Sequence, residues 1–267
     1  MGVRVEQSEH VTTVIHSRPH SRNAMDTESA ESLVQAFTKF EEDPNARVAV
    51  FWGEGGAFCA GWDLKMASAL VGKDKPLAHL DFPDDKTIKT PRGPMGPSRM
   101  NLTKPVICAI AGPAVAGGME LALWCDLRVM ESSSYMGVYC RRWGVPLIDG
   151  GTVRLPRLVG QGRALDIIMT GRKIPAEEAL QIGLCERVVP DGRSREEAEK
   201  LAHEISRFPQ ECMNADRRSV YLQHGLPVDA AMEAEWNNSI HVLTEEGIEG
   251  ANRFKKGQGR HGDFKNI

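Results

Sequence analysis

The sequence lacks the patterns that identify several classes of protein. No apolar stretch approaches the roughly 20 residues that a membrane-spanning helix needs, and neither a GxSxG turn nor a Walker phosphate loop is present. The six cysteines form no CxxC pair and the eight histidines show no metal-ligand spacing, so we expect no metal site. The formal net charge of −3 gives no basic excess, so neither nucleic acid nor a membrane is expected as a partner.

The cysteines and the N-terminus both indicate a reducing compartment. Several cysteines lie inside apolar runs, as Cys108 does in VICAI, and are expected to be buried thiols. The N-terminal residues already alternate between apolar and polar positions like a strand pair, which leaves little room for a signal peptide. We therefore expect a cytoplasmic protein.

The chain reads as a series of strand–loop–helix steps followed by a helical part. Apolar alternation and short apolar runs predict strands at 3–7, 11–15, 47–52, 105–111, 127–130 and 185–189. Helical signals predict helices at 26–42, 119–125, from 150 onward, and at 175–182, 194–206, 209–223 and 227–247. Asp26 is the expected N-cap of the first helix, and Ser194 with Glu197 forms a capping box. The composition changes near Pro190, so we predict a core over residues 1–190 and a helical region over residues 191–267.

Residues 72–104 interrupt this pattern. They contain repeated prolines and glycines, which break both helices and strands. Long irregular loops of this kind are more often functional covers or mobile segments than core.

Two phrases share one logic, VAVFWGEGGAFCAGWDL at 48–64 and PVICAIAGPAVAGGMEL at 105–121. In each, a buried strand leads to a loop of small residues from which a helix departs. The first N–H groups of a helix have no partner within it and lie at its positive end. Two such loops side by side would direct two N–H groups at one point, forming an oxyanion hole for a carbonyl oxygen that gains charge. Taken singly, each phrase is better explained as a tight strand–helix turn, because glycine loops are weak motifs.

Together with RPHSRNAM at 18–25, GGTVRL at 150–155 and RFKKGQGRHG at 253–262, these phrases resemble the crotonase, or enoyl-CoA hydratase/isomerase, superfamily. The resemblance implies an α/β fold: a spiral of ββα units with a C-terminal helical trimerisation region. It also implies an acyl-CoA thioester as substrate, no further cofactor, and a homotrimer or dimer of trimers.

The resemblance places the two oxyanion N–H groups on Trp62 and Gly117. Position 62 would then act through its backbone, and its indole would line the acyl or thioester pocket unless it is purely structural. One catalytic glutamate of the family's hydratases matches Glu120. The alternative for Glu120 is an ordinary acid in the first turn of a helix.

The family's second hydratase glutamate has no match here, because its position holds Cys140. Asp149 offers a substitute, since an aspartate at the matching position moves a proton in dienoyl-CoA isomerases. The alternative for Asp149 is an N-cap of the helix that begins at 150.

The family also suggests which residues contact coenzyme A. Arg22, Ala24, Ala60, Asp63 and Leu64 match positions along the adenine and pantetheine groups. Cys140 would contribute to the substrate pocket.

The resemblance implies an enzyme that hydrates an enoyl-CoA or shifts its double bond through a stabilised enolate. Cys140 favours isomerisation or a hydratase with one glutamate, whereas the frequency of activities in the family favours hydration. A non-catalytic acyl-CoA carrier and a hydrolase or dehalogenase with Asp149 as nucleophile remain as alternatives.

Overall fold

The computed structural model describes residues 2–262, which form two compact units. One unit extends to Ala202 and the other begins at His203, so helix α7 (Ser194–Ser206) crosses the division. The start of α7 is bound to the first unit, because Glu199 accepts a hydrogen bond from Thr13 at 2.8 Å. None of the helices in residues 2–262 has the length and apolar character that crossing a membrane requires.

The first unit is built on a mixed sheet. Its strand order is β1-β2-β3-β4-β6-β9, with β1 antiparallel to β2 and the remaining neighbours parallel. A smaller sheet has the order β5-β7-β8. The strands are β1 (Val3–Ser8), β2 (Val11–His16), β3 (Val48–Gly53), β4 (Val106–Ile110), β5 (Pro113–Val115), β6 (Leu127–Glu131), β7 (Tyr135–Gly137), β8 (Ile174–Pro175) and β9 (Arg187–Val189). The predicted α/β class is confirmed.

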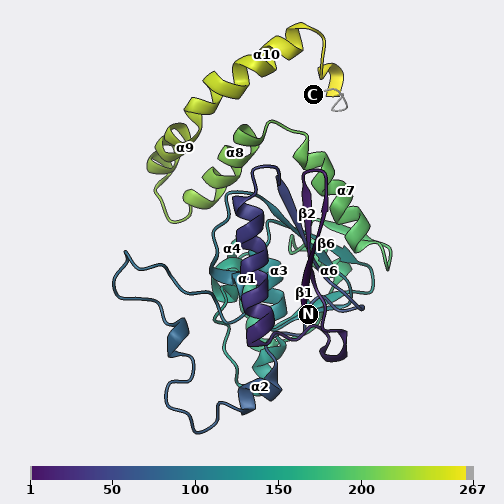
Figure 1. Ribbon diagram of the computed structural model, residues 1–267, viewed down its shortest axis with the longest axis vertical. Helices are drawn as coiled ribbons and strands as arrows, with labels where there is room; N and C mark the ends of the chain where they lie inside the picture. Colours follow the sequence, from purple (N-terminus) through teal and green to yellow (C-terminus); the bar gives the residue numbers. More distant parts are fainter. Residues whose placement is uncertain (1, 263–267) are drawn as a thin grey trace. The chain divides into compact units, whose positions relative to one another are not determined.

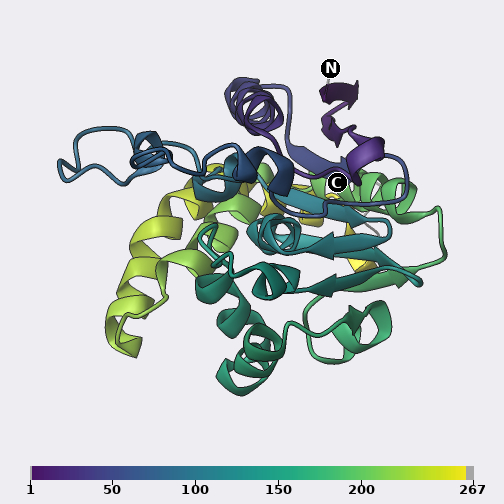
Figure 2. The ribbon, with the colours of Figure 1, turned by 90° about the horizontal axis from the view of Figure 1, so that it is seen from below.

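Helices follow most of these strands, as Figures 1 and 2 show. In the first unit α1 packs along β1 and β2, and α3 packs against α4. Besides α7, the α-helices of the described residues are α1 (Thr27–Glu42), α2 (Leu64–Ser68), α3 (Gly117–Trp124), α4 (Gly151–Val159), α5 (Gln161–Thr170), α6 (Ala176–Gln181), α8 (Gln210–Leu222), α9 (Val228–Val242) and α10 (Ile248–Lys255).

Helix α1 begins and packs as its sequence predicts. The Asp26 side chain accepts a hydrogen bond from the Ser29 N–H at 2.7 Å, which satisfies one of the unpaired donors of the first turn. Leu33, Phe37 and Phe40 lie on its buried face. The Phe37 ring meets that of Phe51 on β3 edge to face, with centroids 5.5 Å apart.

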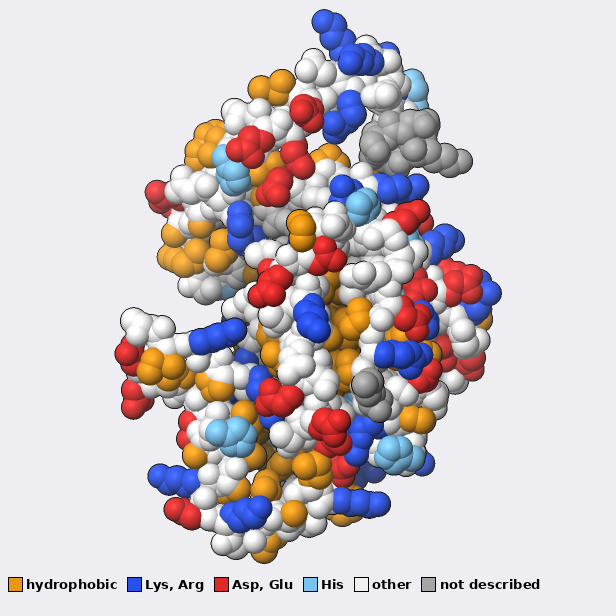
Figure 3. Space-filling model, in the orientation of Figure 1, with side chains coloured by type: hydrophobic (Ala, Val, Ile, Leu, Met, Phe, Trp, Pro, Cys, Tyr) orange, Lys and Arg blue, Asp and Glu red, His pale blue; other side chains and the backbone are white. Residues whose placement is uncertain are grey.

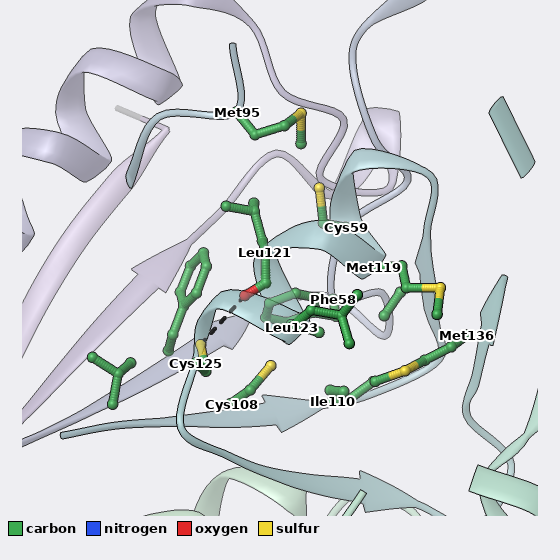
Figure 4. Close-up of a cluster of buried hydrophobic side chains, with 14 of the residues drawn as sticks. Phe58, Cys59, Met95, Cys108, Ile110, Met119, Leu121, Leu123, Cys125 and Met136 are labelled. Carbon is green, nitrogen blue, oxygen red and sulfur yellow. Dashed lines mark hydrogen bonds between the residues drawn. The ribbon is translucent and has the colours of Figure 1, made fainter. Parts of the chain in front are cut away.

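The centre of the first unit is a cluster of apolar and sulfur-containing side chains (Figure 4). Cys108 and Ile110 on β4 and Leu121 and Leu123 on α3 belong to this cluster, and the Cys125 thiol donates to the Leu121 carbonyl at 3.5 Å. The structure therefore confirms that Cys108 is a buried thiol. This packing fixes α3, whose N-terminus carries the second glycine phrase.

Three local predictions differ from the structure. Residues 113–115, expected within a loop, form β5, because they pair with β7. The last helical segment does not end at 247, because a π turn at Leu243–Gly247 joins α9 to α10. The Ser194 hydroxyl donates to the Glu131 carboxylate at 2.8 Å, which differs from the expected capping box with Glu197.

The insertion at 72–104 is largely irregular, as predicted, with short 3-10 turns at Ala78–Leu80 and Pro97–Arg99. Its first half projects away from the strands of the first unit (Figures 1 and 2). Its second half returns to the core, where Met95 and Ser98 are buried.

The second unit exposes many large apolar side chains. Met232 and Trp236 of α9 are 66% and 63% exposed, and hydrophobic side chains gather over the α8–α9 hairpin in Figure 3. An apolar surface of this kind is typical of a face that meets another protein. Trimerisation through residues 191–267 stays a prediction.

His16, at the end of β2, predicts a pH-dependent stability. Both ring nitrogens are buried without a hydrogen-bond partner within residues 2–262. Burial, assisted by the charge of Arg18, lowers the pKa of His16 from 6.5 to about 4. The folded protein therefore resists a protonation that the unfolded chain accepts, and stability is lost as the pH falls from 6.5 to 4.

We expect His16→Leu to remove this dependence. Relative to the variant, the wild type should lose about 3 kcal/mol of unfolding free energy between pH 7 and pH 4. Urea denaturation of both proteins across this range measures the difference, and the other titrating groups cancel in it. A difference that stays constant with pH would contradict the assignment.

Candidate active site

The two glycine phrases meet backbone to backbone. A Cβ atom at Gly61 would lie 2.8 Å from the Cβ of Ala116 and 3.2 Å from the nitrogen of Gly117. A Cβ atom at Gly118 would collide with the carbonyl oxygen of Cys59. Glycine is therefore required at 61 and 118, because any side chain would separate the loops.

Trp62 and Gly117 each present an unused N–H group. Within residues 2–262 neither amide donates a hydrogen bond, although the amides of Gly61, Asp63 and Ala116 do. The Gly61 amide donates to the Cys59 sulfur at 3.4 Å, and the Asp63 amide donates to the Met25 carbonyl at 2.9 Å. Two unpaired donors thus occur on loops that touch.

Ala116, the N-cap of α3, holds a strained conformation just before Gly117. Its φ of 54° and ψ of −127° are unusual for a residue with a side chain. Such strain costs on the order of 1–3 kcal/mol and is found mainly at functional sites. Gly117 follows as the first residue of α3, where its amide has no hydrogen-bond partner within the helix.

Trp62 and Gly117 border one pocket, which encloses about 580 Å³ of empty space including open solvent at its mouth. Most of its wall is apolar, with acidic groups only at two positions. The lining residues are Ala60, Trp62, Leu64, Pro94, Met95, Ala116, Gly117, Glu120, Tyr139, Cys140, Trp143, Val145, Pro146, Ile148 and Asp149. An apolar cleft with a few convergent polar groups is typical of a small-molecule site.

Glu120 lies on the first turn of α3 and is only 3% exposed. Its Oε1 atom accepts hydrogen bonds from the Asp149 amide at 2.9 Å and the Gly151 amide at 2.8 Å. Burial, and then the negative charge of Asp149, raise the pKa of Glu120 to about 7. A carboxyl group with this pKa exchanges protons readily near neutral pH.

Asp149 lies beside Glu120, and its alternative role as an N-cap is wrong. The N-cap of α4 is Gly150, at a φ of 97°, and no side chain caps the helix. The Asp149 Oδ1 atom accepts instead from the Met95 amide at 3.0 Å and from the Ser98 hydroxyl. Burial raises the pKa of Asp149, while these two donors and nearby arginines oppose the rise.

Cys140 borders the pocket from the 3-10 turn Tyr139–Trp143. Burial and the charge of Glu120 raise the pKa of this thiol. It therefore remains protonated near neutral pH, and it is a weak hydrogen-bonding group in the place where the family's hydratases carry a second carboxylate.

The predicted coenzyme A contacts divide into two groups. Ala60 and Leu64 line the pocket. Arg22, Ala24 and Asp63 are not among its lining residues. The Arg22 carbonyl accepts from the Ala60 amide at 3.0 Å, and Asp63 forms an ion pair of 3.2 Å with Arg18. Contact of these residues with coenzyme A stays a prediction.

Nothing in the sequence assigned a role to Met95, Ser98 or Arg154. Met95 and Ser98 lie in the irregular insertion, where no periodicity marks a side chain as buried. Arg154 is recognised only from its contacts, since its guanidinium donates to the carbonyls of Asp149 at 2.9 Å and Ser98 at 2.8 Å.

Comparisons with known proteins show the family to which the chain belongs. Residues 6–261 match the family described as enoyl-CoA hydratase/isomerase. The enoyl-CoA hydratase EchA19 of Mycobacterium tuberculosis is 36% identical over 258 residues, which cover 94% of this chain and 92% of that protein. The (E)-benzylidenesuccinyl-CoA hydratase of Thauera aromatica is 33% identical over 230 residues, 86% of each. A crystal structure of an enoyl-CoA hydratase from Mycobacterium tuberculosis H37Rv superposes with a TM-score of 0.85 at 29% identity, over 96% of each chain.

The family match covers nearly the whole chain, and the two relatives match 94% and 86% of it. The superposition confirms the crotonase-like fold that the motifs resemble. The chain is therefore an enzyme that belongs to the enoyl-CoA hydratase/isomerase family, within the crotonase superfamily.

Proposed function

We propose that this protein adds water to, or moves, the carbon–carbon double bond of an enoyl-CoA, with Glu120 and Asp149 transferring the protons. The observation that carries the proposal is the contact between these residues: the Asp149 amide donates to the Glu120 carboxyl while both side chains border the pocket. The amides of Trp62 and Gly117 would bind the thioester oxygen and stabilise its charge as the enolate forms.

The surroundings of the two carboxyl groups divide their roles. Asp149 receives an amide and a hydroxyl hydrogen bond, which favour its ionised form. Glu120 retains its proton up to a pKa of about 7. In hydration, Asp149 would take a proton from water as the hydroxyl adds to the β carbon, and Glu120 would protonate the α carbon. In migration, Asp149 would take the γ proton and Glu120 would again protonate the α carbon.

The remaining features of the proposal follow from the same resemblance. The substrate is the coenzyme A thioester itself, and no other cofactor takes part. Both relatives described above are named as hydratases, which favours water addition, whereas Cys140 in place of a second glutamate favours migration. We propose that the protein is cytoplasmic and forms a homotrimer or dimer of trimers. The exposed apolar side chains of α8 and α9 support the assembly.

Removal of either proton carrier should abolish most of the turnover. We expect Glu120→Gln and Asp149→Asn each to lower kcat by about 10²–10⁴-fold, because each amide keeps the shape but carries no transferable proton. The assay is a panel of crotonyl-, 3-enoyl- and dienoyl-CoA thioesters followed for hydration and bond migration. Glu28→Gln, at an exposed position of α1, is the matched control and should retain full activity.

The outcomes of this panel distinguish the alternatives. Full activity of both variants on every substrate turned over would contradict the assigned roles. Binding of acyl-CoA without turnover by the wild type would favour a carrier. An acyl-aspartate adduct at Asp149, detected by mass spectrometry, would favour a nucleophilic mechanism.

The pH dependence should reveal which carboxyl group delivers the proton. Since Glu120 acts in its protonated form, kcat/KM should fall as the pH rises through about 7. Asp149→Asn removes the charge that helps to raise the pKa of Glu120, so the alkaline limb of its residual activity should move to lower pH. An alkaline limb that does not move in Asp149→Asn would contradict this division of roles.

Substitutions at position 62 separate the side chain from the backbone. Trp62→Ala keeps the N–H group and should lower kcat by less than about tenfold. Trp62→Pro removes it and should lower kcat by about 10²–10³-fold. The proline displaces no existing hydrogen bond of the described residues, and glycine precedes it. Thermal unfolding checks that both variants are folded, and an active Trp62→Pro would refute the role of this amide.

A further inference from the structure

Asp149 is held by a segment that lies about 50 residues earlier in the chain. Gly93 and Gly96 exchange two backbone hydrogen bonds, of 3.1 and 2.9 Å, which close a tight turn around Met95. The Met95 amide of this turn donates to Asp149 Oδ1 at 3.0 Å. A Cβ atom at Gly93 would lie 1.9 Å from the Ser98 hydroxyl oxygen and 2.5 Å from Asp149 Oδ1, so glycine is required there to leave room for both groups.

Ser98 supplies the second donor to that oxygen. It is 2% exposed, and its hydroxyl donates to Asp149 Oδ1. A serine hydroxyl has a single proton to donate, so this proton is committed to the carboxylate. Both hydrogen bonds require Oδ1 to act as an acceptor, and they are strongest when the carboxylate is charged.

The guanidinium of Arg154 holds the two residues together through their backbones. Nη1 donates to the Asp149 carbonyl at 2.9 Å and Nη2 donates to the Ser98 carbonyl at 2.8 Å. The separation of the two main chains is therefore fixed independently of the side-chain contact. The second carboxylate oxygen, Oδ2, accepts no hydrogen bond from residues 2–262, although Asp149 lines the pocket.

We infer that Ser98 is a positioning residue for Asp149: its hydroxyl, with the Met95 amide, fixes Oδ1 in the charged form and leaves Oδ2 to exchange a proton with the substrate. The inference rests on the proposed function of Asp149. It assigns to the end of the 72–104 insertion a direct part in preparing the base.

Ser98→Ala removes this hydroxyl and leaves Met95, Arg154 and the backbone in place. We expect kcat to fall about 10–100-fold, the effect of losing one hydrogen bond to a charged group, with KM within about threefold of the wild type. Because the hydroxyl lowers the pKa of Asp149, the acid limb of kcat/KM should move to higher pH. Ser98→Thr keeps a hydroxyl and should recover most of the activity.

Ser194→Ala is the matched control. Ser194 is buried and donates its hydroxyl to a carboxylate, that of Glu131 at 2.8 Å, and neither residue lines the pocket. It should lower the thermal unfolding midpoint without changing the pH profile. A Ser98→Ala protein that matches the wild type in kcat and in its acid limb would overturn the inference.

Two further measurements separate this inference from the proposed function. In the double variant Ser98→Ala/Asp149→Asn, kcat should be no lower than in Asp149→Asn alone, because Ser98 acts through the Asp149 carboxylate. The infrared difference between the wild type and Asp149→Asn, followed against pH, reports the protonation of Asp149 without any substrate. The midpoint of this titration should rise when Ser98→Ala is introduced. An unchanged midpoint refutes the inference alone, whereas full activity of Asp149→Asn refutes the proposed function.

Discussion

One carboxylate oxygen, Oε1 of Glu120, joins the two helices on which the site depends. It accepts the amides of Asp149 and Gly151 at the start of α4, while Glu120 itself belongs to the first turn of α3. The first amides of a helix have no partner within it, so an acceptor oxygen at this point stabilises α4 and fixes its distance from the loop that carries Gly117. The position of Asp149 is a consequence of this bond, since its amide is one of the two donors.

The pocket buries two acids in an apolar wall, and their unequal partners determine how they behave. Burying a carboxylate is unfavourable unless donors replace the lost water. Asp149 obtains the Met95 amide, the Ser98 hydroxyl and the fields of two arginines, whereas Glu120 has two amides and the field of one of these arginines, but also a negative neighbour. Burial raises the pKa of both groups, but the donors and arginines oppose the rise at Asp149, whereas Glu120 holds a proton near neutral pH.

Close approach of backbones is the second constraint. Gly61 and Gly118 have no room for a Cβ atom, and Ala116 accepts a positive φ at the point where the loops touch. Proline and glycine make the insertion irregular, yet its turn at Gly93 reaches Asp149. Irregular backbone therefore contributes to the site at two places, the touching glycine loops and the turn at Gly93. A regular helix or strand would leave no free amide donors there.

The sequence by itself determined the strands of the larger sheet and the helix α1, because periodic apolar residues and the Asp26 cap are local signals. It also indicated the two glycine phrases and the acids Glu120 and Asp149, since their spacing resembles one family. Only the tertiary structure decided that Asp149 is not a helix cap, that Ser194 bonds Glu131, and that Ser98 and Met95 hold the base. Hydrogen bonds between segments dozens of residues apart leave no periodic trace in the chain, because they depend on where packing places each backbone.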